Sequence, residues 1–308
     1  MVTHYYNHSR SKTLNKIDKP KDGSWVVAIH PSEDELQELV AQYHLDADLL
    51  RDGLDVNEVP RVERDGKATY IYLRYSSAVD QSETTVPILL VHTDDVLITL
   101  SAVPFAGLDA YTNQKVQFYT TQRTKLLLLL VSEVISSYQS DQIRIAKKIR
   151  GLRSGLNKEN LANKDFLTMI DMEEDLNDFL AALTPMSAML RVLVGGKYLK
   201  LYEDDRDLID DIQLNIAEQL EMAKGNLKTV VNIREAYATI MANSLNRVFK
   251  LMTSITILMS IFTMVTGIYS MNIALPGGHN PEVFWIIIAV TGALISVVAL
   301  MFKRKNWF

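Results

Sequence analysis

The sequence predicts an α+β domain, built on a mixed sheet with helices, followed by a very long helix and two C-terminal transmembrane helices. Two apolar runs near the C-terminus, the first within the uncharged residues 251–281, predict the transmembrane part. Strand-type patterns before residue 122 and helix-type patterns after it predict the rest. Together these observations indicate an integral membrane protein with a large domain outside the bilayer.

Composition limits the classes of function. The 308-residue chain has room for a soluble domain and a membrane piece, and its formal net charge is −5. Between Lys250 and Lys303 the only charged residue is Glu282, so the soluble part is clearly acidic and suits divalent cations better than nucleic acid. No basic stripe with interleaved aromatic residues, typical of nucleic-acid binders, is present.

The chain also lacks the residue patterns of an enzyme. It contains no cysteine, which excludes disulfides, thiolate metal sites and cysteine nucleophiles. No nucleophile elbow, phosphate-binding loop or pair of catalytic acids is visible. We therefore expect no enzymatic activity and no organic cofactor.

We expect residues 1–122 to form the α/β domain. The first 24 residues are polar and basic, which predicts a loose entry, and they lack the apolar core of a signal peptide. Residues 25–30 read as a strand. Ser32, followed by three acidic residues, predicts a helix start, and residues 44–51 suggest a second short helix.

The clearest hairpin lies at residues 61–75, where Asp65-Gly66 suits a tight turn and alternate tyrosines suit a strand. Further strands are predicted at residues 86–91, 96–100 and 116–120.

Residues 123–202 are predicted to be a helical region. The apolar run 126–130 is too short to span a membrane and indicates a core helix. Two charged amphipathic helices are expected at residues 140–156 and 158–183. A bend region between helices is marked by Pro185, Gly195 and Gly196.

Residues 203–269 are predicted to be one helix that continues into the first membrane crossing. This stretch has no proline, and Gly225 is its only glycine before Gly267. Its length would be roughly 100 Å at 1.5 Å per residue. Because so long a helix needs neighbours, we expect symmetric oligomerisation. Apolar residues recur at a helical period at Ile209, Ile212, Ile216, Leu220, Ala223, Leu227 and Val230.

The membrane hairpin consists of a first crossing at about 250–269, a loop at 270–282 and a second crossing at 283–302. About 20 apolar residues in a helix span the ~30 Å hydrocarbon core. The alternative is a buried helical hairpin of a soluble protein, which the uncharged runs and their basic flanks disfavour.

The flanking charges predict the orientation. Arg247 and Lys250 precede the first crossing and the basic tail 303–308 follows the second, while the loop has no Lys or Arg. Cationic flanks favour the cytoplasmic side, so both termini should be cytoplasmic in a cell-membrane protein with two spans. Trp285 and Trp307 lie where indole rings prefer the membrane interface.

The string Gly267-Ile-Tyr-Ser-Met-Asn272 resembles the Gly-Met-Asn signature of CorA-type magnesium transporters, with Ser270 at the family's glycine. The resemblance extends to residues 243–250, to Pro281-Glu282 and to the C-terminal basic residues that precede Trp307. It implies a funnel-shaped homopentamer in the bilayer, without nucleic acid as a partner. It also implies channel-like transport of hydrated Mg²⁺, with Co²⁺ and Ni²⁺ as further candidates, gated by divalent ions bound at the cytoplasmic domain.

By this resemblance Ser270, Met271 and Asn272 form the selectivity loop at the outer mouth. Mg²⁺ holds its water shell tightly, and a ring of asparagine carbonyls can accept hydrogen bonds from those waters. A loop after a helix often needs a left-handed backbone, which glycine adopts without the penalty that serine pays. Ser270 therefore predicts either a strained turn or a hydroxyl that helps to hold ion-bound water.

A stripe of polar and small residues runs along the first crossing, with a spacing of three or four that places it on one helix face. Such residues are equally expected as packing contacts between membrane helices, and the adjoining loop signature favours pore lining. The candidate pore-lining residues are Asn246, Phe249, Met252, Thr253, Thr256, Ser260, Thr263 and Gly267. The opposite face, suited to lipid or to the second helix, carries Leu251, Ile255, Leu258, Phe262 and Val265.

Carboxylates crowd the start of the long helix, where Arg206 is the one base among eight acids between 203 and 221. Crowding of this kind is unfavourable unless cations offset it, although a solvated face is the alternative for most of these acids. The resemblance implies that Asp211, near Asp207, helps to bind regulatory Mg²⁺, with Asp94 or Asp95 of a neighbouring subunit as the partner.

Two other functions stay open. One is a transporter of zinc or another metal from the same superfamily, which the loop sequence does not separate from a magnesium transporter. The other is a non-conducting, membrane-anchored metal sensor or scaffold, favoured by Ser270 in place of glycine. His4 and His8 have a zinc-like spacing, but without partner ligands nearby we expect their placement to be incidental.

Overall fold

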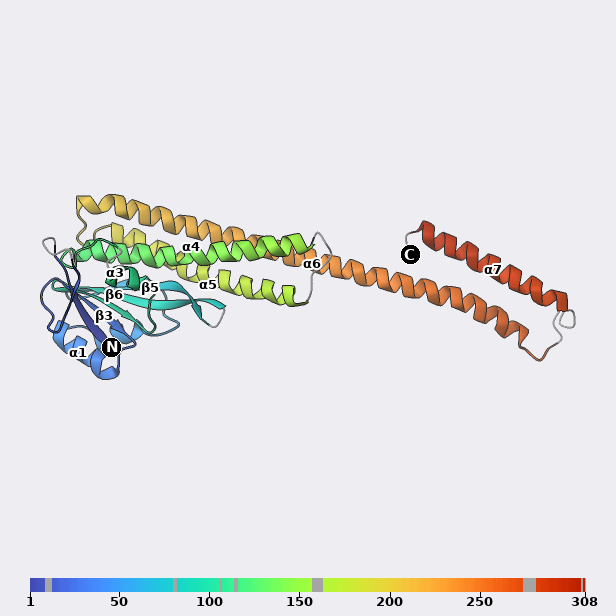
Figure 1. Ribbon diagram of the computed structural model, residues 1–308, viewed down its shortest axis with the longest axis horizontal. Coiled ribbons are helices and arrows are strands. Elements are labelled where there is room, and N and C mark those ends of the chain that lie inside the picture. Colours follow the sequence, from blue (N-terminus) through green and yellow to red (C-terminus); the bar gives the residue numbers. More distant parts are fainter. Residues whose placement is uncertain are drawn as a thin grey trace. The chain divides into compact units, whose positions relative to one another are not determined.

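The computed structural model describes residues 1–8, 13–79, 82–105, 107–113, 116–156, 163–273, 281–305 and 307. They fall into two compact units, Met1–Ile233 and Arg234–Phe308. The strands are β1 (Val2–Tyr6), β2 (Asn15–Ile17), β3 (Ser24–Ile29), β4 (Arg61–Asp65), β5 (Ala68–Val79), β6 (Ser82–His92) and β7 (Val96–Ser101) (Figure 1). The helices are α1 (Glu33–Tyr43), α2 (Ala47–Asp52), α3 (Leu108–Thr112), α4 (Arg123–Leu156), α5 (Asn163–Val194), α6 (Arg206–Tyr269) and α7 (Pro281–Arg304).

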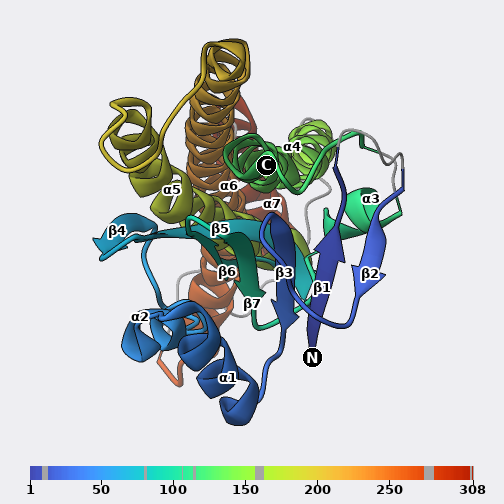
Figure 2. The same ribbon diagram turned by 90° about the vertical axis from the view of Figure 1, so that its left-hand side faces the viewer.

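The first unit is built on a seven-stranded mixed sheet, as the sequence predicts. Its strand order is β2-β1-β3-β7-β6-β5-β4, and β3 and β7 form the parallel pair among otherwise antiparallel neighbours. Figure 2 shows α1 and α2 on one face of the sheet and α4 and α5 on the other.

Alternation along the central strands produces a core on each face of the sheet. On β3, Val26 and Ala28 pack with the residues of α1 and α2, while Trp25 and Val27 point into the larger core beneath α4, α5 and the start of α6. Successive side chains of a strand point to opposite faces. A near-continuous apolar run such as Trp25–Ile29 therefore indicates a strand that is covered on both sides.

Local signals predict the starts of α1 and α2. The Ser32 hydroxyl accepts from the Glu35 amide at 3.2 Å, and the Glu35 carboxylate accepts from the Ser32 amide at 2.9 Å, which is a capping box. The Asp46 carboxylate caps α2 by accepting from the Asp48 and Leu49 amides at 2.8 and 3.0 Å. In the hairpin, Asp65 pairs with Ala68, so Gly66 and Lys67 form a two-residue turn in which Gly66 has φ +53°.

The predicted loose N-terminal entry is wrong. Strand β1 pairs antiparallel with β3, with Tyr5 opposite Trp25, and β2 pairs with the outer edge of β1. The rings of Tyr5 and Trp25 lie 5.6 Å apart. The polar and basic side chains that suggest a loop are compatible with strands at a sheet edge, where one side faces solvent.

The predicted strand at 116–120 is also absent. The short helix α3 precedes this segment, which is joined instead to the end of β1. The Asn7 amide donates to the Thr120 hydroxyl at 2.9 Å, and the Asn7 side chain donates to the Phe118 carbonyl at 3.0 Å. Phe118 is buried against Trp25, at 5.7 Å between ring centroids. Its apolar side chain therefore anchors an irregular segment.

The helical region is more continuous than predicted. The core run 126–130 and the amphipathic stretch 140–156 belong to the single helix α4. Helix α5 continues through Pro185 to Val194, so the predicted bend is wrong at this proline and correct at Gly195-Gly196, where Gly196 has φ +73°. Proline removes one backbone hydrogen bond. Burial of Met186, Met189 and Leu190 beyond it holds the helix together.

The predicted long helix is confirmed. Helix α6 runs for 64 residues without interruption, after a 3-10 turn at Glu203–Asp205. At 1.5 Å per residue it is about 96 Å long. It begins in the first unit and ends in the second, where α7 follows.

Candidate ion-transport site

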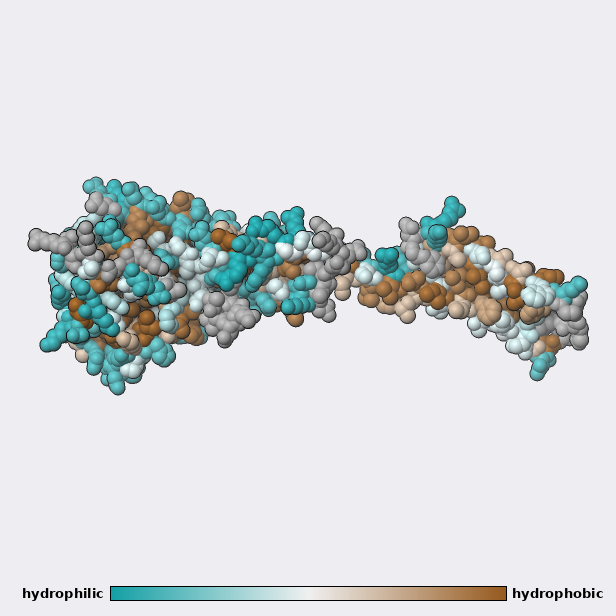
Figure 3. Space-filling model, in the orientation of Figure 1, coloured by the Kyte–Doolittle hydropathy of each residue, from teal (hydrophilic) through white to brown (hydrophobic). Residues whose placement is uncertain are grey.

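Among the described residues, two helices are long and apolar enough to cross a membrane. Their most apolar windows, in α6 and in α7, have mean hydropathies of 1.9 and 2.7. Only 6% of each window is buried, which argues against the core hairpin of a soluble protein. Figure 3 shows the apolar surface that covers α7 and the C-terminal part of α6.

The candidate pore stripe is exposed on the single chain. All eight of its residues are exposed, including Phe249 at 57% and Met252 at 60%. A second line on the same helix is shielded within the unit. At 100° per residue this shielded line lies about 150° from the stripe, so the stripe faces away from its own hairpin. The shielded residues are Ser254, Leu258, Ile261 and Val265.

Three hydroxyl groups of the stripe donate their protons to backbone carbonyls of their own helix. Thr256 donates to the Met252 carbonyl at 2.9 Å, and Ser260 donates to the Thr256 carbonyl at 2.8 Å. Thr263 donates to the carbonyl four residues before it at 3.0 Å. A hydroxyl that donates back to its own helix keeps its oxygen lone pairs free. The stripe is therefore a row of hydrogen-bond acceptors, suited to the waters that surround a cation.

The end of α6 determines the conformation at Ser270. Its amide donates to the Thr266 carbonyl at 3.0 Å, and its hydroxyl donates to the Gly267 carbonyl at 2.9 Å. Among the described non-glycine residues, positive φ occurs at His30 and His44. The strained, left-handed turn expected at Ser270 is therefore wrong, because this residue completes the last turn of the helix. The rest of the predicted loop, residues 274–280, lies outside the described residues.

The Asn272 amide makes no bond to the described residues. It is exposed, and its side chain has no hydrogen-bond partner in the part of the chain that the structure describes. A role in capping α6, which would require such a bond, has no support here. Met271 beside it is 54% exposed. The carbonyl oxygen of Asn272 can therefore accept a hydrogen bond from an ion-bound water.

The four candidate regulatory aspartates lie on two elements. Asp207 and Asp211 are exposed on the first turns of α6, and Asp94 and Asp95 are exposed in the turn between β6 and β7. Asp94 already has a partner, since its carboxylate lies 3.5 Å from the Lys67 ammonium. Within the described ranges no three His, Asp or Glu side chains come together as a metal site.

The β6–β7 turn is held from several sides. The Arg123 guanidinium donates to the Asp94 carbonyl and lies 3.2 Å from the Asp22 carboxylate. Burial, reinforced by Arg123, lowers the pKa of His92 to about 4, so this imidazole is neutral at neutral pH. These contacts fix the backbone that carries Asp94 and Asp95.

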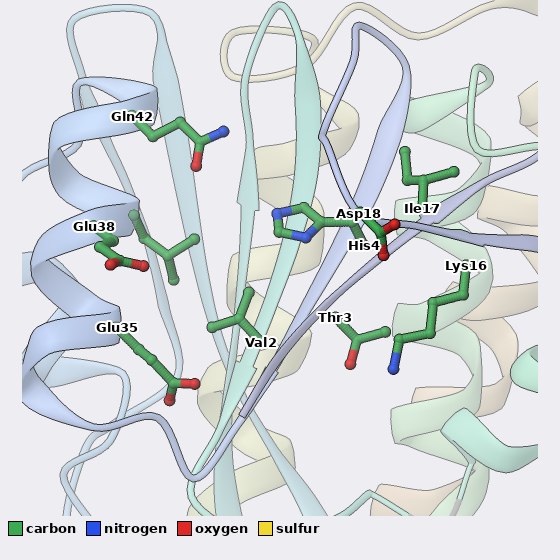
Figure 4. Close-up of a pocket in the computed structure, with 10 residues that line it drawn as sticks. Val2, Thr3, His4, Lys16, Ile17, Asp18, Glu35, Glu38 and Gln42 are labelled. Carbon is green, nitrogen blue, oxygen red and sulfur yellow. The ribbon is translucent and has the colours of Figure 1, made fainter.

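A cavity of about 340 Å³ is lined by α1, by β1 and by the segment of the edge strand β2. Figure 4 shows the His4 ring within it, between the helix that carries Glu38 and the strand edge that carries Asp18. The Nε2 atom of His4 is buried without a hydrogen-bond partner, and burial lowers the pKa of His4. His4 belongs to a strand, and His8 packs edge-on against Tyr6 at 6.0 Å.

Comparison with known proteins identifies the family. The sequence profile of the family described as CorA-like Mg²⁺ transporter protein matches residues 20–304. The chain belongs to this family. The cobalt/magnesium transport protein CorA of Methanocaldococcus jannaschii is 22% identical over 293 residues, which cover 92% of this chain and 90% of that protein. The solved structure of the same CorA magnesium transporter covers 100% of this chain and 99% of its own, with a TM-score of 0.86 and 20% identity.

The chain is also similar to a transporter that is named for a different ion. The zinc transport protein ZntB of Yersinia pseudotuberculosis is 20% identical over 265 residues, which cover 84% of this chain and 80% of that protein. This CorA-family chain is thus a divalent cation transporter of the membrane, which is not an enzyme class.

A ladder of amide side chains connects α4 and α6, and the sequence analysis does not predict it. Gln142 donates to the Gln219 carbonyl at 3.0 Å, Gln219 donates to Asn215 at 3.1 Å, and Asn215 donates to the Ser136 hydroxyl at 3.2 Å. Gln142 and Gln219 are buried. Polar residues next to an apolar helical stripe are the signal that could have revealed this ladder, which fixes the register of α6 against α4.

Proposed function

We propose that this chain forms a homopentameric channel that conducts hydrated Mg²⁺, with Co²⁺ and Ni²⁺ as further ions, down the electrochemical gradient. The observation that carries the proposal is the row of outward-facing acceptor oxygens at Thr256, Ser260 and Thr263, opposite the shielded face of α6. Copies arranged around an axis would turn these rows toward a common pore.

The chemistry of the stripe suits an ion that keeps its water. Mg²⁺ dehydrates reluctantly, and hydroxyl and carbonyl oxygens accept from its waters without replacing them. The stripe contains no carboxylate that could hold the ion too tightly for conduction. Asn272, exposed just after α6, would form the ring at the outer mouth.

A zinc transporter is the second candidate, favoured by the similarity to the zinc transport protein ZntB. Purified protein in proteoliposomes with an internal fluorescent reporter separates the candidates when Mg²⁺, Co²⁺, Ni²⁺ and Zn²⁺ are compared. We expect Mg²⁺ influx that follows the imposed gradient. Influx of Zn²⁺ alone would favour the second candidate, and no influx of any ion would favour a sensor or scaffold.

For gating, we propose that divalent ions bridge subunits near Asp211 and Asp207, with Asp94 or Asp95 of the neighbour. Asp211 has no ion-pair partner among the described residues, so its charge is available. Asp211→Asn should reduce the stabilisation of the protein by Mg²⁺. The measurement is the rise in thermal midpoint between 0 and about 20 mM Mg²⁺, a range that covers the ~10⁻³ M affinities of weak cation sites. Membrane insertion should be unchanged.

The matched control is Glu218→Gln, an exposed acid two turns further along α6. It removes the same charge and should leave the rise intact. An equal rise in the native protein and in Asp211→Asn would assign Asp211 to an ordinary solvated face.

For topology, we propose cytoplasmic termini in the cell membrane. The chain has no cysteine, so single cysteines can be introduced without background. A cysteine at Thr3 would react poorly on either side of the membrane because this position is buried. Lys16 and Ile273 are exposed and suit labelling. In intact cells, an impermeant maleimide should modify a cysteine at Ile273 and spare one at Lys16. The reverse labelling pattern would mean that the termini lie outside the cell. For assembly, native mass spectrometry should show five copies of the chain.

A further inference from the structure

A layer of positive charge surrounds one end of the membrane hairpin. Arg247 and Lys250 precede the apolar part of α6, and Lys303, Arg304 and Lys305 end α7. Lys250 lies about 28 Å along its helix from Tyr269, and Lys303 lies about 33 Å from Pro281, at 1.5 Å per residue. Because α7 runs back beside α6 (Figure 1), both groups lie at the same end of the hairpin.

The sequence places no acidic side chain beside these charges. Between Ala236 and Phe308 the only acid is Glu282, in the first turn of α7 at the opposite end of the hairpin. Residues 234–308 contain six Lys or Arg and two Asp or Glu, which is a net charge of +4 in a chain whose net charge is −5. Within the part of the chain that the structure describes, none of the five boundary cations has an ion pair.

An aromatic pair lies beside the basic triplet. The Trp307 amide donates to the Phe302 carbonyl at 3.1 Å, and the Lys305 amide donates to the Met301 carbonyl at 3.1 Å. The Trp307 bond brings this residue back to the last turn of α7, where its ring stacks on the Phe302 ring with centroids 5.1 Å apart and planes 3° from parallel. Aromatic rings of this kind favour the depth of lipid headgroups and glycerol.

The helix dipole accounts for only part of this arrangement. Lys303 and Arg304 in the last turn of α7 complement the negative end of its dipole. Arg247 and Lys250 lie in the interior of α6, far from either end, so the dipole gives no reason for them. Like charges gathered in one layer repel, and an anion at the same depth would offset the repulsion. Phosphodiester groups of anionic lipids lie at that depth.

We propose that Arg247 and Lys250, together with Lys303, Arg304 and Lys305, bind the headgroup of an anionic phospholipid. The stacked Phe302–Trp307 pair contacts its glycerol region. The site requires cations from both helices of the hairpin. It depends on the hairpin being embedded in a bilayer and is independent of which ion crosses the membrane.

The test is lipid binding by the full-length protein in detergent, followed by native mass spectrometry, with phosphatidylglycerol and phosphatidylcholine as probes. The native protein should prefer phosphatidylglycerol. Each cation removed should weaken that binding about fivefold. Arg247→Gln with Lys250→Gln should therefore cost about 25-fold, and the triple Gln variant at 303–305 more.

The control is Lys224→Gln with Lys228→Gln, which removes two exposed cations from the same helix, away from the boundary. It should change the preference less than twofold. Inorganic phosphate at the same concentration should not displace the lipid, and displacement would identify a general phosphate site instead. Helical circular dichroism confirms that each variant is folded.

Equal binding of the two lipids by native protein would overturn the proposal. Loss of preference in the 303–305 variant alone would overturn the two-helix site. Ion flux is measured separately. Absent flux with an intact lipid preference counts against transport only, and normal flux without the preference counts against the lipid site only.

Discussion

Asn272→Leu should lower divalent cation flux by roughly 100-fold and leave the protein folded. The leucine side chain has a similar size but offers no oxygen to an ion-bound water. One net hydrogen bond contributes about 0.5–1.5 kcal/mol, so five lost contacts in the proposed pentamer amount to ~3 kcal/mol or more. A difference of about 1.4 kcal/mol is tenfold in an equilibrium constant. Because Asn272 is exposed and makes no bond within the described chain, stability should not change.

Flux into proteoliposomes measures this effect, with Asn232→Leu as the matched control. Asn232 is exposed on α6 within the first unit, so the same substitution there should preserve transport. If Asn272→Leu retains half of the native flux, this side chain is not the contact that passes the ion into the pore.

Ser270→Gly then tests the departure from the family signature. Because Ser270 has no left-handed backbone, glycine relieves no strain there. Lower flux or altered ion preference in this variant would therefore report the loss of the hydroxyl. If both the native protein and Ser270→Gly conduct nothing, the sensor or scaffold interpretation takes first place.

The elements that sequence predicts best are those whose signal is local. Two uncharged runs with basic flanks predict α7 and the end of α6, since lipid itself is the partner that buries them. The absence of proline between Tyr202 and Tyr269 predicts the continuity of α6. The capping box at Ser32 and the turn at Gly66 depend only on neighbouring residues.

The elements that the sequence does not predict depend on distant partners. Strand β1 exists because β3 lies beside it, and residues 116–120 are fixed by Asn7 from more than a hundred positions away. Pro185 fails to end α5 because buried residues beyond it hold the helix. The candidate site shows the same contrast between local signals and distant partners. The acceptor stripe is visible in a single sequence, whereas a metal site shared by Asp211 and Asp94 would need a second chain.

The second large effect is expected at Trp25. Its side chain is 0% exposed, its ring lies 5.6 Å from Tyr5, 5.7 Å from Phe118 and 6.3 Å from Tyr111, and its indole donates to the Thr99 hydroxyl at 3.0 Å. It therefore joins β1, α3 and the irregular segment that ends at Thr120 to the sheet. Trp25→Ala should lower the free energy of unfolding by about 3–5 kcal/mol, through lost apolar contact and the cavity that remains.

Amide hydrogen exchange of the full-length protein, read peptide by peptide, measures this loss. About 3 kcal/mol corresponds to more than 100-fold faster exchange where opening limits it. The acceleration should be largest in β1, β3 and residues 116–120, because their common anchor is gone, while α7 keeps its protection. Tyr202→Ala, at a ring that is 57% exposed, is the control and should change stability by less than about 0.5 kcal/mol. Unchanged protection of β1 in Trp25→Ala would mean that backbone pairing alone holds this edge, and that the aromatic cluster does not carry the N-terminal strands.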